Sequence, residues 1–415
     1  MSRSGRLKEE DILDGLSLRY LKVSRLWGIL NHHRETGGRS KVLKAWAIGM
    51  VIAFTPLLMV TVVGPIFTEK DLEGMTVIFL NPIATVQMIF KFGIFWFHME
   101  QQTKLLDLMR KDYLSCVPAD QKAAVSEIMI NAVKDANIYT FFGSRMNIIT
   151  VSLWNILPVL RSEFFRLTLG ISIFGTPVDH NKILGFWYPF DFDGTPGNEI
   201  VYVYEFILCI WTGFIITLLE CLIAQLVVLL TGHLKAFQYL MENFRSSHDP
   251  RMDHRKLLSY VKEHQKLSRA GESICELYNF LITVQLATGL VILILGAFNF
   301  ILGSGKGDVV VMIKFVVYTM YTLVEVTVYC NAGQNLETTS EDVCFAAYSC
   351  DWYEMGVDFR KTLQMMMVRS QSPIVMKAGK LYPVNLTALN NILHMAYSTS
   401  MLLYRIKVPE EKQVM

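Results

Sequence analysis

The stretch EFILCIWTGFIITLLECLIAQLVVLLTG, residues 205–232, is apolar over a length that crosses a bilayer as a helix. About 20 apolar residues in a helix span the hydrocarbon core, where each backbone group must find its hydrogen-bond partner inside the segment. Six further stretches share this character, and together they predict an all-α membrane protein with seven transmembrane helices. The expected spans cover residues 45–67, 74–98, 137–160, 205–232, 278–302, 309–330 and 384–404.

The composition agrees with a membrane protein. Of the 415 residues, 52% are hydrophobic and only 18% are charged, which is outside the range of ordinary soluble domains. A net charge of +2 gives no reason to expect a nucleic-acid partner. The first 44 residues are basic and contain no apolar core, so we expect no cleavable signal peptide and a first span that acts as the anchor.

Lysine and arginine residues sit almost entirely in alternate loops. Residues 1–44, 99–135, 233–277 and 331–380 hold 28 of them, whereas the remaining loops and the tail from residue 405 hold eight. Because basic residues are retained in the cytoplasm, this count predicts a cytoplasmic N-terminus and an extracellular C-terminus in a single seven-span domain, residues 1–415. All seven cysteines fall within spans or on the cytoplasmic side, so we expect reduced thiols.

Two cytoplasmic segments mix apolar and charged residues at helical spacing. Residues 233–277 and 331–371 are not hydrophobic enough to span a bilayer, and they read as helices that extend below it. We expect the segment 331–380 to form a cytoplasmic helical anchor where subunits could meet. Simple solvated loop helices are the alternative.

Several charged residues lie inside the expected spans. Lys91 and Glu205 fall near span ends, from which long side chains usually reach the membrane surface. Arg145, Glu220 and Glu325 lie deeper, and we expect them to pair across helices or to reach water. The sequence does not distinguish a proton relay from a structural pair.

The last span differs from the others because polar residues recur at steps of three and four, which places them on one helix face. That face carries Thr387, Asn391, His394, Ser398, Leu402 and Arg405. Four such helices around an axis would line a pore, which Leu402 and Ile406 near the outer end could close by excluding water. Hydrogen bonding between neighbouring helices is the other reading of the same stripe.

Motifs of soluble enzymes are missing from the sequence. It contains no HExxH, no Walker motif, no dinucleotide-binding glycine loop and no Cys-x-x-Cys. We therefore expect neither enzymatic activity, nor a metal site, nor a cofactor. A transporter is also disfavoured, because no repeat relates the two halves of the chain.

The C-terminal third carries more specific motifs. They are YSCDWYEM at 348–355, RKTLQMMMVRSQSP at 360–373 and AGKLYPVNL at 378–386. Together they closely resemble the closing signature of insect odorant receptors. WYPFD at 187–191 resembles the second outer loop of that family, and YCNAGQNL at 329–336 resembles the end of its sixth span.

The resemblance implies an odorant-gated, non-selective cation channel in the plasma membrane of a sensory neuron dendrite. It implies a heterotetramer with the shared odorant co-receptor, in which this chain is the variable, odour-tuning subunit. In that family the last helix lines the pore. An ungapped alignment from Ala378 puts Leu402 and Ile406 on the gate positions, and Arg405 on a position that is commonly Gln.

Arg405 departs from the family pattern in a way that bears on assembly. A cation at the mouth should repel permeant cations, which favours a heteromer with few copies of this chain. Two alternatives stay open. One is a gustatory-type channel, although Thr399-Ser400 replaces its Thr-Tyr pair. The other is a metabotropic seven-span receptor, whose orientation the charge count opposes.

The family's ligand pocket lies in the outer half of the bundle, between the second, third, fourth and sixth spans. The resemblance therefore implies a pocket for small volatile molecules, and its large aromatic residues suit such ligands. Each of these residues could equally serve packing alone. The expected lining is Thr85, Met88, Ile89, Asn147, Thr150, Trp154, Cys209, Ile210, Gly213, Lys314, Tyr318 and Tyr321.

Overall fold

The structure is a computed structural model that describes residues 72–111, 116–160, 197–306 and 309–407. The first expected span, residues 45–67, and the WYPFD segment, residues 187–191, lie outside the described residues. What the sequence predicts for them stays a prediction.

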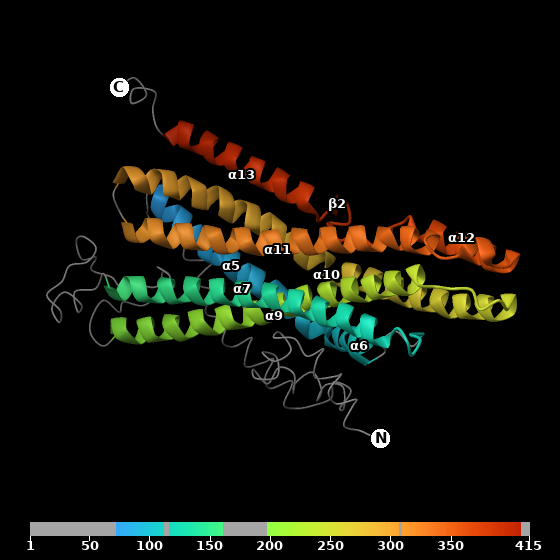
Figure 1. Cartoon of the computed structure of the whole chain (residues 1–415). Coiled ribbons are helices and arrows are strands. Elements are labelled where there is room, and N and C mark those ends of the chain that lie inside the picture. The colour runs from blue at the N-terminus through green and yellow to red at the C-terminus, as the bar shows by residue number, and fades with distance from the viewer. Residues whose placement is uncertain (1–71, 112–115, 161–196, 307–308, 408–415) are drawn as a thin grey trace.

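The described chain is a bundle of long helices, which confirms the all-α class (Figure 1). A two-stranded hairpin is the only sheet within the described residues. The elements in chain order are α5 (Leu72–Phe97), α6 (Met99–Lys111), α7 (Lys122–Leu160), α9 (Gly197–Glu242), α10 (Pro250–Lys306), α11 (Val309–Tyr348), η1 (Trp352–Glu354), α12 (Val357–Ser370), β1 (Lys377–Ala378), β2 (Tyr382–Pro383) and α13 (Leu386–Lys407).

Four of the helices are much longer than the spans that the sequence predicts. At 1.5 Å per residue, the 57 residues of α10 reach about 85 Å, well beyond the 40–45 Å of a whole bilayer. Its polar first half must therefore project out of the membrane. α7, α9 and α11 likewise continue through segments that are too polar to span, as Figure 1 shows at the end of the bundle near α6 and α12.

Three of the described helices, α9, α10 and α11, contain stretches that are long and apolar enough to cross a bilayer by themselves. α7 and α13 carry more polar residues in the stretches expected to span, which lowers their mean hydropathy. All seven cysteines lie within the described residues, and none of them forms a disulfide there. The reduced state of the thiols stays a prediction.

The projecting parts of the helices are held together by an aromatic core. Phe244 contacts the ring of Phe359 from α12, with centroids 5.2 Å apart, and meets Tyr260 of α10 edge-on at 5.5 Å. Phe237 completes this core by stacking on His264 at 5.6 Å. The segment 331–380 contributes the end of α11, η1 and α12 to this bundle.

α13 lies along one edge of the bundle, where it packs against α10 and α11 (Figure 1). Its buried residues, Ala388, Ile392, Ala396 and Ser400, recur every four positions and form one stripe. Because two of them are alanines, the helix axes can approach closely. The start of α13 is fixed by the preceding hairpin, where Asn279 of α10 donates to the carbonyl of Lys377 at 2.6 Å.

Candidate functional site

An aromatic cluster lies between α7 and α11, in the half of the bundle that the sequence predicts to face outward. The rings of Trp154 and Tyr318 meet edge-on, with centroids 5.6 Å apart. The ammonium of Lys314 lies 5.4 Å from the Trp154 ring, within the range of a cation–π contact. All three side chains are partly exposed, so they offer a surface that combines apolar area with polar tips.

A hydrogen-bonded chain links three other predicted residues across α7, α9 and α11. The Asn147 amide donates to the Gly213 carbonyl at 3.2 Å and to the Tyr321 hydroxyl at 3.4 Å. The close approach of the helices depends on Gly213, because a Cβ there would lie 2.6 Å from the Val151 side chain and 2.9 Å from the Asn147 amide oxygen. The backbone of α9 is thereby held against α7.

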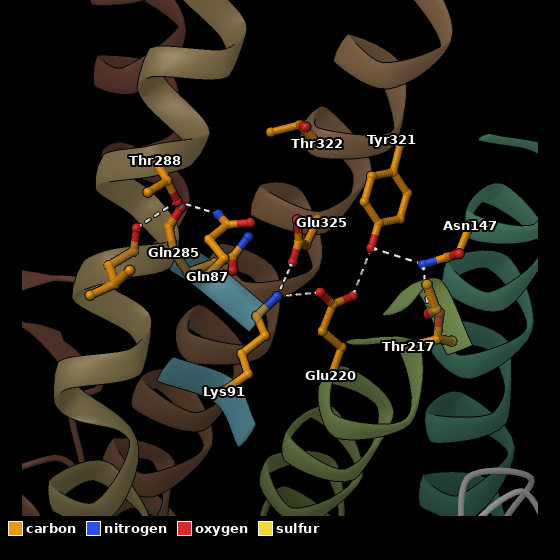
Figure 2. Close-up of polar contacts among 12 residues, drawn as sticks. Gln87, Lys91, Asn147, Thr217, Glu220, Gln285, Thr288, Tyr321, Thr322 and Glu325 are labelled. Atoms are coloured by element: carbon orange, nitrogen blue, oxygen red, sulfur yellow. Dashed lines mark hydrogen bonds and ion pairs between the residues drawn. The ribbon is translucent and has the colours of Figure 1, made fainter. Parts of the chain in front are cut away.

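From Tyr321 the hydrogen bonds continue into a buried ionic cluster. The Tyr321 hydroxyl donates to one carboxylate oxygen of Glu220 at 3.2 Å, and the ammonium of Lys91 bonds the other. The same ammonium lies 2.8 Å from the Glu325 carboxylate. Figure 2 shows Lys91 between the two acids, so one cation joins α5, α9 and α11.

The burial of this cluster corrects part of the sequence interpretation. Lys91 is only 2% exposed and Glu205 is fully buried, so neither reaches the surface as a flexible chain near a span end would. The expectation that Glu220 and Glu325 pair across helices is confirmed. Arg145 does not join them: its exposed guanidinium lies 5.2 Å from the Phe141 ring of its own helix.

The other predicted pocket residues are placed unevenly. Thr85 and Met88 of α5 are buried, and Ile89 packs against the core. The Thr150 hydroxyl donates to the Met146 carbonyl one turn earlier in α7, and Cys209 is half-buried. Ile210 is 46% exposed, whereas Trp154 and Tyr318 are only partly exposed.

The predicted pore residues all lie on the face of α13 that is turned away from α10. The residues with exposed side chains are Thr387, Asn391, His394, Ser398, Leu402, Arg405 and Ile406. Among them, Asn391 donates a hydrogen bond to the Tyr382 hydroxyl at 3.3 Å. A polar stripe that bonded neighbouring helices of the same chain would be buried, so the geometry does not favour that reading within one subunit.

The sequence interpretation missed the position of Lys91 at the centre of the cluster and the Gln87 amide that donates to Thr288 beside it (Figure 2). A usable signal for Lys91 did exist, because Glu220 and Glu325 lie in the inner halves of their expected spans, as Lys91 does. Among the described residues, no three His, Cys, Asp or Glu side chains are close enough to hold a metal ion.

Comparison with known proteins yields one family. Residues 74–397 match the family model described as 7tm Odorant receptor. The chain is 22% identical over 269 residues to odorant receptor 2a of Drosophila melanogaster, which covers 59% of this chain and 66% of that receptor. It is 33% identical over 147 residues to odorant receptor 30a of the same fly, covering 35% and 38%. For odorant receptor 67c the shares are 63% and 62% at 22% identity, so these matches span less than two thirds of each relative.

Solved structures show the same fold. The insect olfactory receptor OR5 from Machilis hrabei, in complex with eugenol, aligns with a TM-score of 0.76 over 98% of both chains at 16% identity. Another structure of that receptor gives a TM-score of 0.74 over 89% of this chain and 91% of the other. At this level of identity the likeness concerns the fold alone.

Proposed function

Because this chain belongs to the insect 7tm odorant receptor family, we propose that it is the odour-tuning subunit of an odorant-gated, non-selective cation channel. In this proposal it assembles with the shared odorant co-receptor as a heterotetramer in the plasma membrane of a sensory dendrite. A small volatile molecule binds in the outer half of the bundle, and the last helix opens the pore.

The exposed polar stripe of α13 carries the channel part of the proposal. One face of this helix is buried on α10 by small residues, so the opposite face is left to contact water or other subunits. Its hydroxyl, amide and imidazole groups could replace part of the hydration of a passing ion. Leu402 and Ile406, 58% and 74% exposed, lie where apolar side chains would close the path by excluding water.

The cluster formed by Trp154, Tyr318 and the Asn147–Tyr321 hydrogen bond supports the ligand part. Partly exposed aromatic rings offer a small volatile molecule a large apolar area, and the polar tips orient it. One receptor with the same fold was solved in complex with eugenol, which agrees with a ligand of this size class. Opening follows if the ligand binds the open arrangement more tightly than the closed one.

Exposed apolar side chains on the projecting bundle support assembly with another subunit. An exposed apolar surface of this kind commonly marks a protein interface. On and around α12 it comprises Phe345, Tyr353, Val357, Met365 and Val368, each more than half exposed. Arg405 makes a homotetramer unfavourable, because four guanidinium groups would crowd one cation path.

The test is whole-cell current from cells that express this chain with and without the co-receptor, across a panel of volatiles and with G-protein signalling blocked. We expect a fast cation current that needs both chains and survives the block. A response that vanishes under the block would identify a metabotropic receptor instead. Accumulation of labelled ligand without a conductance would identify a transporter.

Replacing Trp154 with Ala removes the edge-on contact with Tyr318 and the support of Lys314. We expect a changed ranking of odorants, with potency for the preferred compound falling about tenfold, since an aromatic contact together with lost burial is worth on the order of 1.5 kcal/mol. Currents evoked by a co-receptor agonist should persist. Loss of both currents would show a failure of folding or assembly, and Trp154→Phe serves as the matched control.

A further inference from the structure

The ionic cluster contains one negative charge too many. Two carboxylates, Glu220 and Glu325, face a single ammonium, and within the described residues Lys91 is the only cation paired with either acid. Both acids lie in helices that cross the apolar part of the bundle, where an uncompensated charge is costly. The excess charge therefore requires a proton or a cation as counter-charge.

A cleft between α7, α9 and α11 opens directly onto these carboxylates. Its cavity volume is about 40 Å³, which leaves room for only a small group, and the wider space of about 470 Å³ around it includes the open surroundings. Besides Glu220 and Glu325, three tyrosine rings line it, those of Tyr139, Tyr321 and Tyr329. Figure 2 shows two of the elements of this wall, the Tyr321 hydroxyl and the Glu220 carboxylate, pointing toward each other.

An independent observation points to a missing polar ligand. Tyr329 is only 4% exposed, and its hydroxyl has no hydrogen-bond partner among the described residues. Buried hydroxyl groups are nearly always paired, so this oxygen calls for an outside donor or acceptor. A proton on a carboxylate would cancel the excess charge, but it would neither fill the cleft nor satisfy this hydroxyl.

We propose that the cleft binds the ammonium head of a small protonated amine, at a level about two to three helical turns deeper than the aromatic cluster of Trp154 and Tyr318. The ammonium donates to a carboxylate and to the Tyr329 oxygen, and the tyrosine rings surround it as cation–π partners. The narrow interior restricts the head group to primary or other small amines. The assignment rests on the proposed function, because it names a ligand class for the same receptor.

The site is coupled to the rest of the pocket through Tyr321. Its hydroxyl donates to Glu220 on one side and accepts from Asn147 on the other. An ammonium that bonds to Glu220 weakens the bonds that this carboxylate accepts from Lys91 and Tyr321. Binding in the cleft is thus transmitted to α5 and α11, which the Lys91 bridges connect.

The experiment measures the melting temperature of the purified full-length chain in potassium buffer at pH 7.4, titrated with butylamine or with the isosteric neutral butan-1-ol. We expect the amine to stabilise the protein at concentrations at least about tenfold lower than the alcohol, as charge-assisted hydrogen bonds require. Equal stabilisation by both compounds overturns the proposal. So does equal stabilisation by sodium chloride, which would identify an inorganic cation.

Variants test which residues hold the amine. Glu220→Gln leaves Lys91 and Glu325 as a balanced pair, so the protein should fold, and the apparent affinity for butylamine should fall at least about tenfold. Gly143→Leu fills the cleft without altering charge, because a Cβ at this lining residue meets nothing within 4 Å. Gly143→Leu should lower the apparent affinity for butylamine similarly, and it tests the cleft even if Glu220→Gln does not fold. Gly93→Leu, at an equally open helical glycine that does not line the cleft, is the matched control.

The outcome separates this proposal from the channel function. An amine that stabilises the purified chain, while no volatile evokes a current with the co-receptor, supports the cleft and overturns the channel. Currents evoked by neutral volatiles, together with no stabilisation by the amine, overturn the cleft and support the channel. Unchanged amine affinity in folded Glu220→Gln and Gly143→Leu also overturns the cleft.

Discussion

At the scale of single residues, Lys91 has the largest structural influence because it bonds acids from two other helices while nearly fully buried. Its four-carbon stem was expected to carry the charge to the membrane surface. Two buried carboxylates hold it inside instead, since the attraction between opposite charges is strong where water is excluded. Whether a lysine side chain extends to the membrane surface thus depends on which charged partners lie at the same depth in the membrane.

Replacing Lys91 with Met should destabilise the protein severely. The substitution leaves Glu220 and Glu325 buried without a cation, and removing one partner of a buried ion pair costs about 3–5 kcal/mol. The measurement is the melting temperature of the purified chain in detergent. The triple variant Lys91→Met, Glu220→Gln and Glu325→Gln should recover most of the loss, and a triple variant as unstable as the single one would contradict the argument.

A second residue-scale prediction concerns His264, in the polar first half of α10. Burial, and to a lesser extent the positive charge of the nearby Arg369, together lower the pKa of this imidazole from 6.5 to about 4. The unfolded chain therefore binds a proton between these two pH values while the folded chain does not. Stability from the neutral ring is complete above pH 6.5 and is lost as the pH falls toward 4.

Melting curves from pH 7.5 to 4.5 test this dependence. A shift of this size corresponds to a loss on the order of 3 kcal/mol at the acidic end. His264→Asn should make the curve shallower over that range, because the substituted side chain does not titrate. If wild type and His264→Asn lose stability in parallel, the titration of another group is responsible.

At the scale of elements, α13 divides into a face that packs and a face that is left open. Cysteines introduced at His394 and Ser398, on the exposed face, should react with a charged thiol reagent in channels assembled with the co-receptor, and the reaction should reduce the current. A cysteine at Ala396, on the buried face, should stay unmodified. Equal reactivity at the three positions would show that the stripe does not line a water-filled path.

The helices themselves could be predicted because apolar length is a local property of the sequence. Six expected spans each coincide with one described helix, apart from one residue at the end of α5 and two at the start of α13. Helices extending below the membrane were also predicted, from apolar residues at helical spacing. Polarity alone marks only where a span ends and leaves open whether the helix ends with it. α10 continues unbroken because the polar part of its sequence contains no proline after its first residue and only a single glycine.

The site was harder to predict than the helices, and the residues show why. Asn147 and Tyr321 were assigned to one pocket from the family resemblance together with their depth from the same membrane side, and depth can be read from a sequence. Depth alone does not decide what Ile210 contacts, because that depends on rotation about the helix axis. α9 is apolar on all sides, so its hydropathy carries little rotational signal. Predicting the contacts of Lys91 would have required both the depth of the residues and the rotation of three helices about their axes.

At the scale of the whole molecule, the contacts divide the bundle into two parts with different roles. The projecting end is fixed by a continuous aromatic core around Phe244 and Tyr260. The half predicted to face outward is linked by partly exposed rings and single hydrogen bonds, such as the one between Asn147 and Tyr321. Regions with fewer buried contacts open at lower free energy, so a ligand should shift the second part and leave the first in place.

The two attachments of α13 differ in kind. At its inner end, a Cβ on Gly333 would lie 2.1 Å from the Val384 carbonyl, so backbones meet there with no room to slide. Near its outer end, the Ser400 hydroxyl donates to the Ile294 carbonyl at 2.9 Å, but it also has the Ala396 carbonyl of its own helix within 2.7 Å. The hydroxyl can exchange one acceptor for the other and lose little.

α13 can therefore pivot about its fixed inner end when the Ser400 hydrogen bond to Ile294 breaks. Its 22 residues make a helix of about 33 Å, so a tilt of about 5° at the inner end moves the outer end by about 3 Å. Breaking this hydrogen bond costs at most about 1 kcal/mol, less than twice the thermal energy. In the proposed channel, Ser400→Ala should therefore raise the current that flows without odorant, measured in co-expressing cells, because the hydroxyl that restrains the outer end of α13 is gone.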